Sequence, residues 1–272
     1  MIGQLNTIVQ DLIRLSVWFV LLAVIFIPLE RFIPRSPQPI IRKNLLEDCF
    51  YYFLNGILPK LILVLPLSLL AAFIHHLGSN SFYAAVDSLS VRKRLILALV
   101  ICDFGAYWGH RWSHEIPFLW RFHSVHHSAT EMDWLVNSRA HPFDMVFTRL
   151  SGLIPIYLLG FAQPTANTAD IVPFIYMIFG NFWSFVIHAI VNLRFGWFER
   201  LLASPAFHHW HHTNEATPLM NKNFAAIFPF YDCLFGSHFL PKSRWPASYG
   251  LAEAAPASSP QPSSIQKTLS ST

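Results

Sequence analysis

The chain has 272 residues, of which 53% are hydrophobic and only 12% are charged. Because a soluble domain carries about 25% charged residues, this composition predicts a protein that lies in a lipid bilayer. The net charge of +4 is small and accompanies no known nucleic-acid-binding motif, so nucleic acid is not an expected partner. The three cysteines form no CxxC pair, and we expect buried thiols, not disulfides, at Cys49, Cys102 and Cys233.

Apolar stretches recur along the chain and predict an all-α membrane protein with about four transmembrane or membrane-embedded helical segments. The first stretch runs from residue 17 to 33, and we expect it to be retained, not cleaved as a signal peptide. The later stretches are residues 57–74, 95–108, 145–161 and 171–190. Pro59 and Pro66 interrupt the second stretch, which a membrane helix tolerates. The last two stretches predict a hairpin that enters and leaves on one side.

A basic, proline-rich loop follows the first stretch and contains Arg31, Arg35, Arg42 and Lys43. The positive-inside tendency places this loop in the cytoplasm, and the parity of the later segments places the histidine-rich regions on the same side. The run Arg92-Lys93-Arg94 fits this topology poorly, because it would lie at the outer end of the third stretch.

The domain division that we expect has three parts. Residues 1–44 form an N-terminal membrane segment and its loop, and residues 45–250 form a membrane domain whose cytoplasmic, histidine-rich helical cap holds a dimetal site. Residues 251–272 are rich in Ala, Ser and Pro, a composition typical of disorder.

Nine histidines fall into three short clusters with the spacings HxxxH, HxxHH and HxxHH. On a helix, residues three and four apart share a face, so each cluster can present several imidazoles together. Arg111 stands where the HExxH motif of zinc proteases needs a glutamate. Eight of the nine rings, all except His209, have ligand spacing. One structural zinc takes four ligands, so these eight rings predict two metal ions. Ligation by nitrogen alone favours iron or zinc.

Other residues near the clusters are candidates for supporting roles. His188 ends the last apolar stretch, where an ionisable group is a functional candidate. Asp103 and Tyr107 lie on the helical face of His110, and Asp103 is a candidate second-shell acceptor for a ligand histidine. His141 is a candidate for a ligand, a supporting or a loop-structural role. On a helix, His209 points away from its triplet. Interfacial or structural roles are expected for His75, His76 and His238.

The order HxxxH, HxxHH, a histidine near a membrane exit and HxxHH resembles the fatty acid hydroxylase/sterol desaturase superfamily of integral-membrane non-haem di-iron enzymes. The flanking segments 103–111, 137–142 and 231–236 fit as well, and the resemblance covers roughly residues 45–250. It is specific for the superfamily, not for a substrate. It implies that two metals are bound by His110, His114, His123, His126, His127, His188, His208, His211 and His212. Asn192 stands where some members have a further histidine.

The activity implied by the resemblance is an O2-dependent hydroxylation or desaturation of a membrane lipid, with two irons per chain. Electrons would come from a separate reductase, ferredoxin or cytochrome, because the sequence has no dinucleotide-binding or CxxC motif and no recognisable haem domain. The substrate-binding residues are not identified, although the wall of a lipid path could include Trp108, Trp112, Trp120, Trp134 and Trp183. The alternatives are a zinc-dependent membrane hydrolase or isomerase and a non-catalytic metal-binding protein. The location expected is a bacterial inner membrane.

Overall fold

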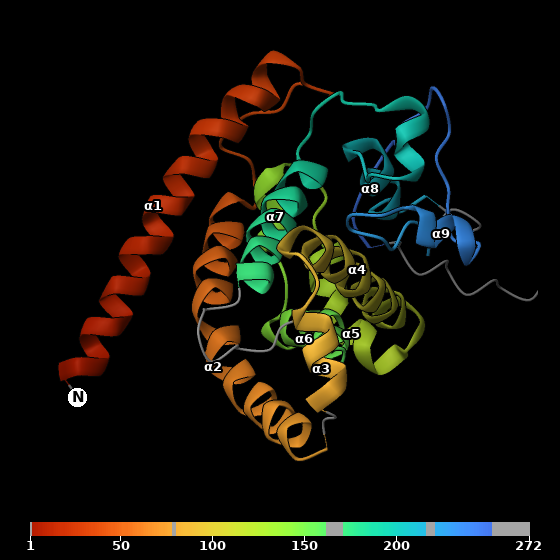
Figure 1. The fold of residues 1–272 in the computed structure, drawn as a ribbon. Coiled ribbons are helices and arrows are strands. Elements are labelled where there is room, and N and C mark those ends of the chain that lie inside the picture. Colours follow the sequence, from red (N-terminus) through yellow and green to blue (C-terminus); the bar gives the residue numbers. More distant parts are fainter. Residues whose placement is uncertain (1, 78–79, 162–170, 216–220, 252–272) are drawn as a thin grey trace, which may run out of the picture.

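The computed structural model describes residues 2–77, 80–161, 171–215 and 221–251, and within these ranges the chain is helical with no strand (Figure 1). Two isolated bridges, Pro34 with Val191 and Thr213 with Tyr249, are the only β-type pairings in the described ranges. The helical segments are α1 (Ile2–Phe32), α2 (Leu45–Leu77), α3 (Asn80–Asp87), α4 (Val91–Glu115), α5 (Pro117–His127), η1 (Trp134–Ser138), α6 (Pro142–Leu158), α7 (Ile171–His188), η2 (Gly196–Arg200), α8 (Pro205–His211) and α9 (Phe230–Leu234). The all-α prediction is therefore confirmed.

Two helices in the described ranges are long and apolar enough to cross a bilayer. They are residues 7–32 of α1 and 45–74 of α2, with mean hydropathies of 2.5 and 2.4. Both are longer than predicted, because α1 begins at Ile2 and α2 begins at Leu45, before the apolar stretch. Pro59 and Pro66 lie inside α2 without ending it. Figure 1 shows α1 along one edge of the molecule, with α8 and α9 on the opposite side.

The other predicted apolar stretches form α4, α6 and α7. As predicted, α4 continues without a break from the apolar stretch through His110 and His114. Small residues let α4 and α6 approach closely: a Cβ on Gly105 would lie 2.1 Å from the backbone oxygen of Ser151. Such a crossing has no room for a larger residue, so Gly105 sets the separation between α4, which carries His110 and His114, and α6.

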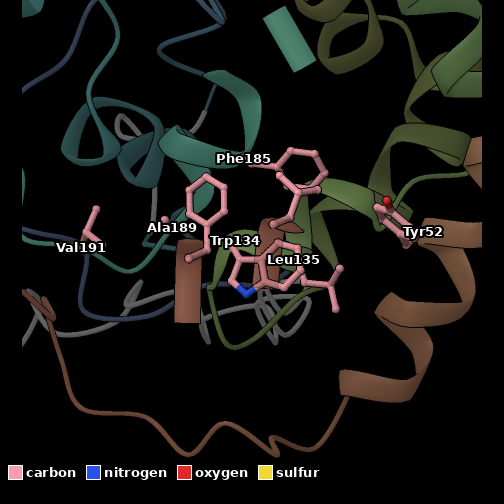
Figure 2. Packing of buried hydrophobic residues seen from close by; sticks show 8 residues of the cluster. Tyr52, Trp134, Leu135, Phe185, Ala189 and Val191 are labelled. Carbon is pink, nitrogen blue, oxygen red and sulfur yellow. The ribbon is translucent and has the colours of Figure 1, made fainter. Parts of the chain in front are cut away.

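A cluster of aromatic side chains joins α1 and α2 to the rest of the fold. Trp134 of η1 lies with its ring centroid 5.9 Å from those of Phe26 on α1 and Phe185 on α7. Figure 2 shows Trp134, Leu135 and Phe185 in this cluster. Because η1 is only a few residues from the second histidine cluster, this packing ties the membrane helices to the histidine-bearing region.

Buried ion pairs make a second connection between the same parts. Arg42 pairs with Asp48 and, at 2.6 Å, with Asp133, while Arg139 pairs with Asp48 at 2.6 Å. Arg42 was expected as one of the charges of the basic loop, and the structure buries it among these carboxylates. The loop backbone also reaches the end of α7, since the amide of Asn192 donates to the carbonyl of Ile33.

Three further predictions concern the cysteines and the connecting segments. All three cysteines are free, but only Cys102 is buried, whereas Cys49 is half-buried and Cys233 is exposed. Cys233 was expected to be buried, but its position in the short helix α9 faces outward. Residues 163–167 between the last two apolar stretches lie outside the described residues, as does almost all of the tail, 252–272.

Candidate metal centre

Nine histidine side chains converge from four helical segments that are distant in sequence. They come from the end of α4, from α5, from the end of α7 and from α8 with its C-cap. Seven of the nine are buried and two, His110 and His114, are half-buried. These are the nine histidines that the sequence resemblance singled out.

The nine histidines form two groups, and within each group the facing nitrogens all lie within 4.8 Å of one another. The five-histidine group consists of His110, His114, His123, His127 and His211. The four-histidine group consists of His126, His188, His208 and His212. The structure thus offers two adjacent places for a cation.

Each HxxHH triplet is divided between the two groups. In the first triplet, His123 and His127 belong to the five-histidine group and His126 belongs to the other. In the second triplet, His208 and His212 share the four-histidine group, and His211 crosses to the first. Residues four apart differ by only about 40° around a helix, whereas adjacent residues differ by about 100°. The outer pair of each triplet therefore points to one centre and the middle histidine to the other.

Hydrogen bonds at the back of the rings determine which nitrogen is available to a metal. Four Nδ1 atoms lie 2.7–2.9 Å from backbone carbonyl oxygens: His110 from Phe224, His126 from Arg139, His188 from Ser184 and His211 from Lys222. A carbonyl oxygen can only accept, so the proton of each neutral ring is on Nδ1 and the lone pair is on Nε2. This arrangement is the one that prepares a histidine to bind a metal through Nε2.

The Nε2 atoms at the front of the rings are too close together for ordinary packing. In the four-histidine group, the Nε2 atom of His188 lies 3.2 Å from that of His126 and 3.0 Å from that of His208. Nitrogens that bind one ion at about 2.1 Å are separated by roughly 3.0–3.4 Å. In the five-histidine group, the Nε2 atoms of His110, His114 and His211 are buried and have no hydrogen-bond partner among the described residues. Both sets of nitrogens fit the ligand shell of a metal ion.

Burial and neighbouring charges keep several rings of the two groups neutral. Burial and the neighbouring histidines lower the pKa of His126 to about 4 and hold the pKa values of His208, His211 and His212 well below the usual range. Neutral imidazole is the form that binds a metal, so the protonation state of these rings suits ligation near pH 7.

Asp144 on α6 is a residue of the site that sequence reasoning missed. It is 6% exposed, and its Oδ2 lies 3.0 Å from Nδ1 of His123. Burial opposes ionisation of this carboxyl, but its interactions with His123 outweigh the effect of burial and lower the pKa of Asp144. The available signal was an acidic residue at the start of an otherwise apolar stretch, because such a residue seldom lacks a role in a membrane protein.

Asp103 does not have the contact that was expected of it. Its carboxylate accepts the backbone N–H groups of Ile227 and Phe228, at 3.2 and 2.9 Å, instead of a histidine N–H. The reason is the close packing of the 224–228 loop on this face of α4, which takes up both carboxylate oxygens. Tyr107 likewise contacts Ser237 through its hydroxyl, at 2.9 Å, and packs in an aromatic cluster.

Three other candidates lie outside both groups. His141 caps α6, where its Nδ1 accepts the N–H of Phe143 at 3.1 Å. His209 points away from its triplet, as expected, and contacts the Tyr249 hydroxyl and the backbone carbonyl of His188. Asn192 is exposed and belongs to neither group.

The five candidate tryptophans are separated by the fold. Trp120 packs against the rings of His114 and His127, with centroids 5.1 and 5.6 Å apart. Trp134 lies in the core cluster with α1, and Trp183 stacks on Phe179. Within the described ring contacts, Trp120 is therefore the tryptophan of this set that touches the histidine groups.

The all-helical fold, the membrane-capable helices and the paired histidine groups together fit a class of membrane-associated proteins whose histidines could hold metal ions. The model of the fatty acid hydroxylase family matches residues 95–237, more than half of the chain and almost the whole histidine-bearing region. The chain belongs to the fatty acid hydroxylase family.

Relatives with recorded activities share this region. The chain is 33% identical to an ornithine lipid hydroxylase of Rhizobium tropici over 57% of this chain and 44% of that protein. It is 28% identical to the alkylglycerol monooxygenase of Homo sapiens, over 50% of this chain and 28% of that protein. It is 26% identical to a methylsterol monooxygenase of Arabidopsis thaliana, over 59% and 58% of the two chains. The matched regions thus span about a quarter to three fifths of these relatives' lengths. No solved structure matches the chain.

Proposed function

We propose that the protein is a membrane oxidoreductase that binds two irons and uses O2 to hydroxylate, or to desaturate, an unactivated C–H position of a lipid. The observation that carries this proposal is the pair of histidine groups, one of five and one of four rings, whose facing nitrogens lie within 4.8 Å of one another. The nine histidines named above are the proposed ligands, the five-histidine group for one iron and the four-histidine group for the other. When bound, iron supplies the activation of O2 that an unactivated C–H bond requires.

The contributions of the protein itself follow from the hydrogen bonds. Backbone carbonyls and Asp144 hold the Nδ1 protons, so that the Nε2 lone pairs face the metal positions. Trp120 and Phe224 pack against the ring of His114 and shield part of the five-histidine group from water. Iron is favoured over zinc because nine imidazoles exceed the three protein ligands of a catalytic zinc.

The balance of the reaction requires an electron donor. Hydroxylation converts R–H, O2, two electrons and two protons into R–OH and water, and desaturation releases two waters from the same oxidant. We propose that a separate reductase, ferredoxin or cytochrome supplies the two electrons. The substrate is proposed to be a lipid because the named relatives carry ornithine lipid, alkylglycerol and methylsterol in their names.

The proposed location is a bacterial inner membrane, with the histidine groups on the cytoplasmic side. This orientation is supported by Arg31, in the last turn of α1, and by Arg35, in the loop that follows. The backbone of residues 33–35 pairs with residues 190–192, just after His188. The basic loop and the metal groups therefore lie at the same end of the membrane helices. Arg92 and Lys93 begin α4, at the other end of that helix from His110.

Metal content tests this proposal first. The chain is purified in detergent after growth with iron and zinc both available, and both metals are measured per folded chain. We expect about two irons, and a loss of iron in His126→Ala and His211→Ala, which alter one group each. The matched control is His141→Ala, which removes an imidazole outside both groups and is expected to keep both irons.

The lipids of cells that express the wild-type chain or His126→Ala are then compared by mass spectrometry. A lipid that gains 16 mass units, or loses 2, only with the wild-type chain supports the oxidative reaction. Stoichiometric zinc instead of iron would indicate hydrolytic chemistry, and a folded chain without bound metal would contradict the proposal.

A further inference from the structure

A short segment next to the five-histidine group has an unusual backbone. Asn221 and Asn223 have φ angles of 59° and 61°, and they are the non-glycine residues with positive φ in the described ranges. Asparagine is among the few residues that adopt this left-handed conformation at low cost. Two such residues, separated by one position, indicate that the path of the chain here is held by specific contacts.

This segment provides an acceptor to three of the five histidines. The Oδ1 atom of Asn221 lies 3.2 Å from Nδ1 of His114. The next acceptor is the carbonyl of Lys222, 2.8 Å from Nδ1 of His211, and then the carbonyl of Phe224, 2.7 Å from Nδ1 of His110. The three histidines come from α4 and α8, which are about a hundred residues apart in sequence, so this segment gives rings from both helices a common set of acceptors.

Asn223 anchors the middle of the segment. Its side chain is fully buried, and its Nδ2 donates to the carbonyls of Phe207, at 2.8 Å, and Phe239, at 2.7 Å. Its Oδ1 accepts the N–H of Phe239 at 2.7 Å. Phe207 precedes His208 in α8, so Asn223 ties the segment directly to the helix that carries His211.

Two buried carboxylates anchor the following residues. Asp232 accepts the N–H groups of Phe224 and Ala225, at 2.8 and 2.9 Å. Asp103 accepts those of Ile227 and Phe228. Asp103 belongs to α4, seven residues before His110, so the segment is fixed to the second histidine-bearing helix as well.

We propose that residues 221–228 form a positioning element for the five-histidine group, in which Asn221, Asn223 and Asp232 hold three acceptors at the Nδ1 side of His110, His114 and His211. The element fixes the proton of each ring on Nδ1 and turns its Nε2 towards a common point. The three named residues are positioning residues, since they act through the histidines. This inference rests on the metal binding proposed above and assigns a role to side chains that lie outside the histidine clusters.

Asn221 offers the sharpest test because its side chain is exposed and its replacement leaves the core intact. Asn221→Gly keeps the left-handed backbone but removes the acceptor for His114. The matched control is Asn221→Asp, because aspartate also tolerates the left-handed conformation and retains an acceptor oxygen. Each detergent-purified variant is loaded with Fe(II) without oxygen, and the iron that remains is measured against increasing chelator, with helix content followed by circular dichroism.

We expect Asn221→Gly to weaken binding of one iron about 10- to 100-fold, the usual effect of losing such an orienting contact. Asn221→Asp is expected to bind both irons as the wild-type chain does. Asn223→Gly, which keeps the backbone conformation and removes three buried hydrogen bonds, is expected to weaken the same iron at least as much.

Equal iron affinity in wild-type, Asn221→Gly and Asn221→Asp chains of the same helix content would overturn the inference. If Asn223→Gly does not fold, the Asn221 pair still decides. Failure of the proposed metal binding gives a different result, because the wild-type chain would then bind no iron at all.

Discussion

Asp144 should strengthen iron binding by the five-histidine group, because its carboxylate contacts His123, a histidine of that group. Its Oδ2 lies 3.0 Å from Nδ1 of His123, and the pair is almost fully buried. In Asp144→Asn, the side chain keeps its size and one acceptor oxygen but loses its charge, and a charge-assisted hydrogen bond is roughly twice as strong as a neutral one. Loss of an orienting carboxylate lowers metal affinity about 10- to 100-fold, which corresponds to about 1.4–2.7 kcal/mol.

The assay is the retention of Fe(II) by the detergent-purified chain against a chelator, with helix content as the test of folding. Ser113→Ala is the matched control, since Ser113 Oγ donates to the same carboxylate over a long 3.5 Å contact and its loss should change the affinity little. The reasoning is refuted if folded Asp144→Asn retains both irons with wild-type affinity, or if Ser113→Ala weakens iron binding as much as Asp144→Asn does.

Three further predictions concern stability. Gly105→Ala should lower stability by about 1–3 kcal/mol through overpacking, because the added Cβ would strike the α6 backbone. Gly180→Ala should change stability little, since the atom nearest to its Cβ would lie 3.8 Å away. Thermal unfolding in detergent compares the two variants. Asp48→Asn should lower stability by about 3–5 kcal/mol, because it leaves buried arginines poorly paired. Lys60→Ala removes an exposed ion pair and should lower stability by under about 1 kcal/mol. Equal shifts of the melting temperature in the two variants would contradict this contrast. The metal-free chain should lose stability as pH falls from about 6.5 towards 4. The pKa of His126 is about 4 in the folded chain and about 6.5 when unfolded, so the unfolded state takes up protons first. A melting temperature that is unchanged between about pH 7 and pH 5 would contradict this linkage.

The helices could be predicted because their signals are local. Long apolar stretches, broken only by prolines that a membrane helix tolerates, predicted α1, α2, α4, α6 and α7 in order. Their ends were less predictable: α2 begins 12 residues before the apolar stretch that starts at residue 57, because Glu47 and Asp48 in its first turn are stabilised there by Arg139. Those ion pairs join residues about 90 positions apart, so no local pattern contains them.

Supporting residues were harder to predict than the histidines. Asp103 and Asp144 are both acidic residues in apolar helices, and the sequence offers no means to tell which of them faces a histidine. The contact of α5 with α6 places Asp144 beside His123, while the 224–228 loop covers Asp103. The orienting role that was expected of Asp103 belongs, in the structure, to Asp144.

The sequence by itself determined that eight histidines would lie on helices with their rings grouped, because residues three and four apart share a helical face whatever the fold around them. Only the tertiary structure decided how they are shared. The packing of α4, α5, α7 and α8 sends the outer pair of each HxxHH triplet to one centre and the middle histidine to the other, giving groups of five and four. Adjacent residues on a helix point about 100° apart, so neighbours such as His126 and His127 can serve different centres, and the centre that each one meets depends on which helix packs against that side.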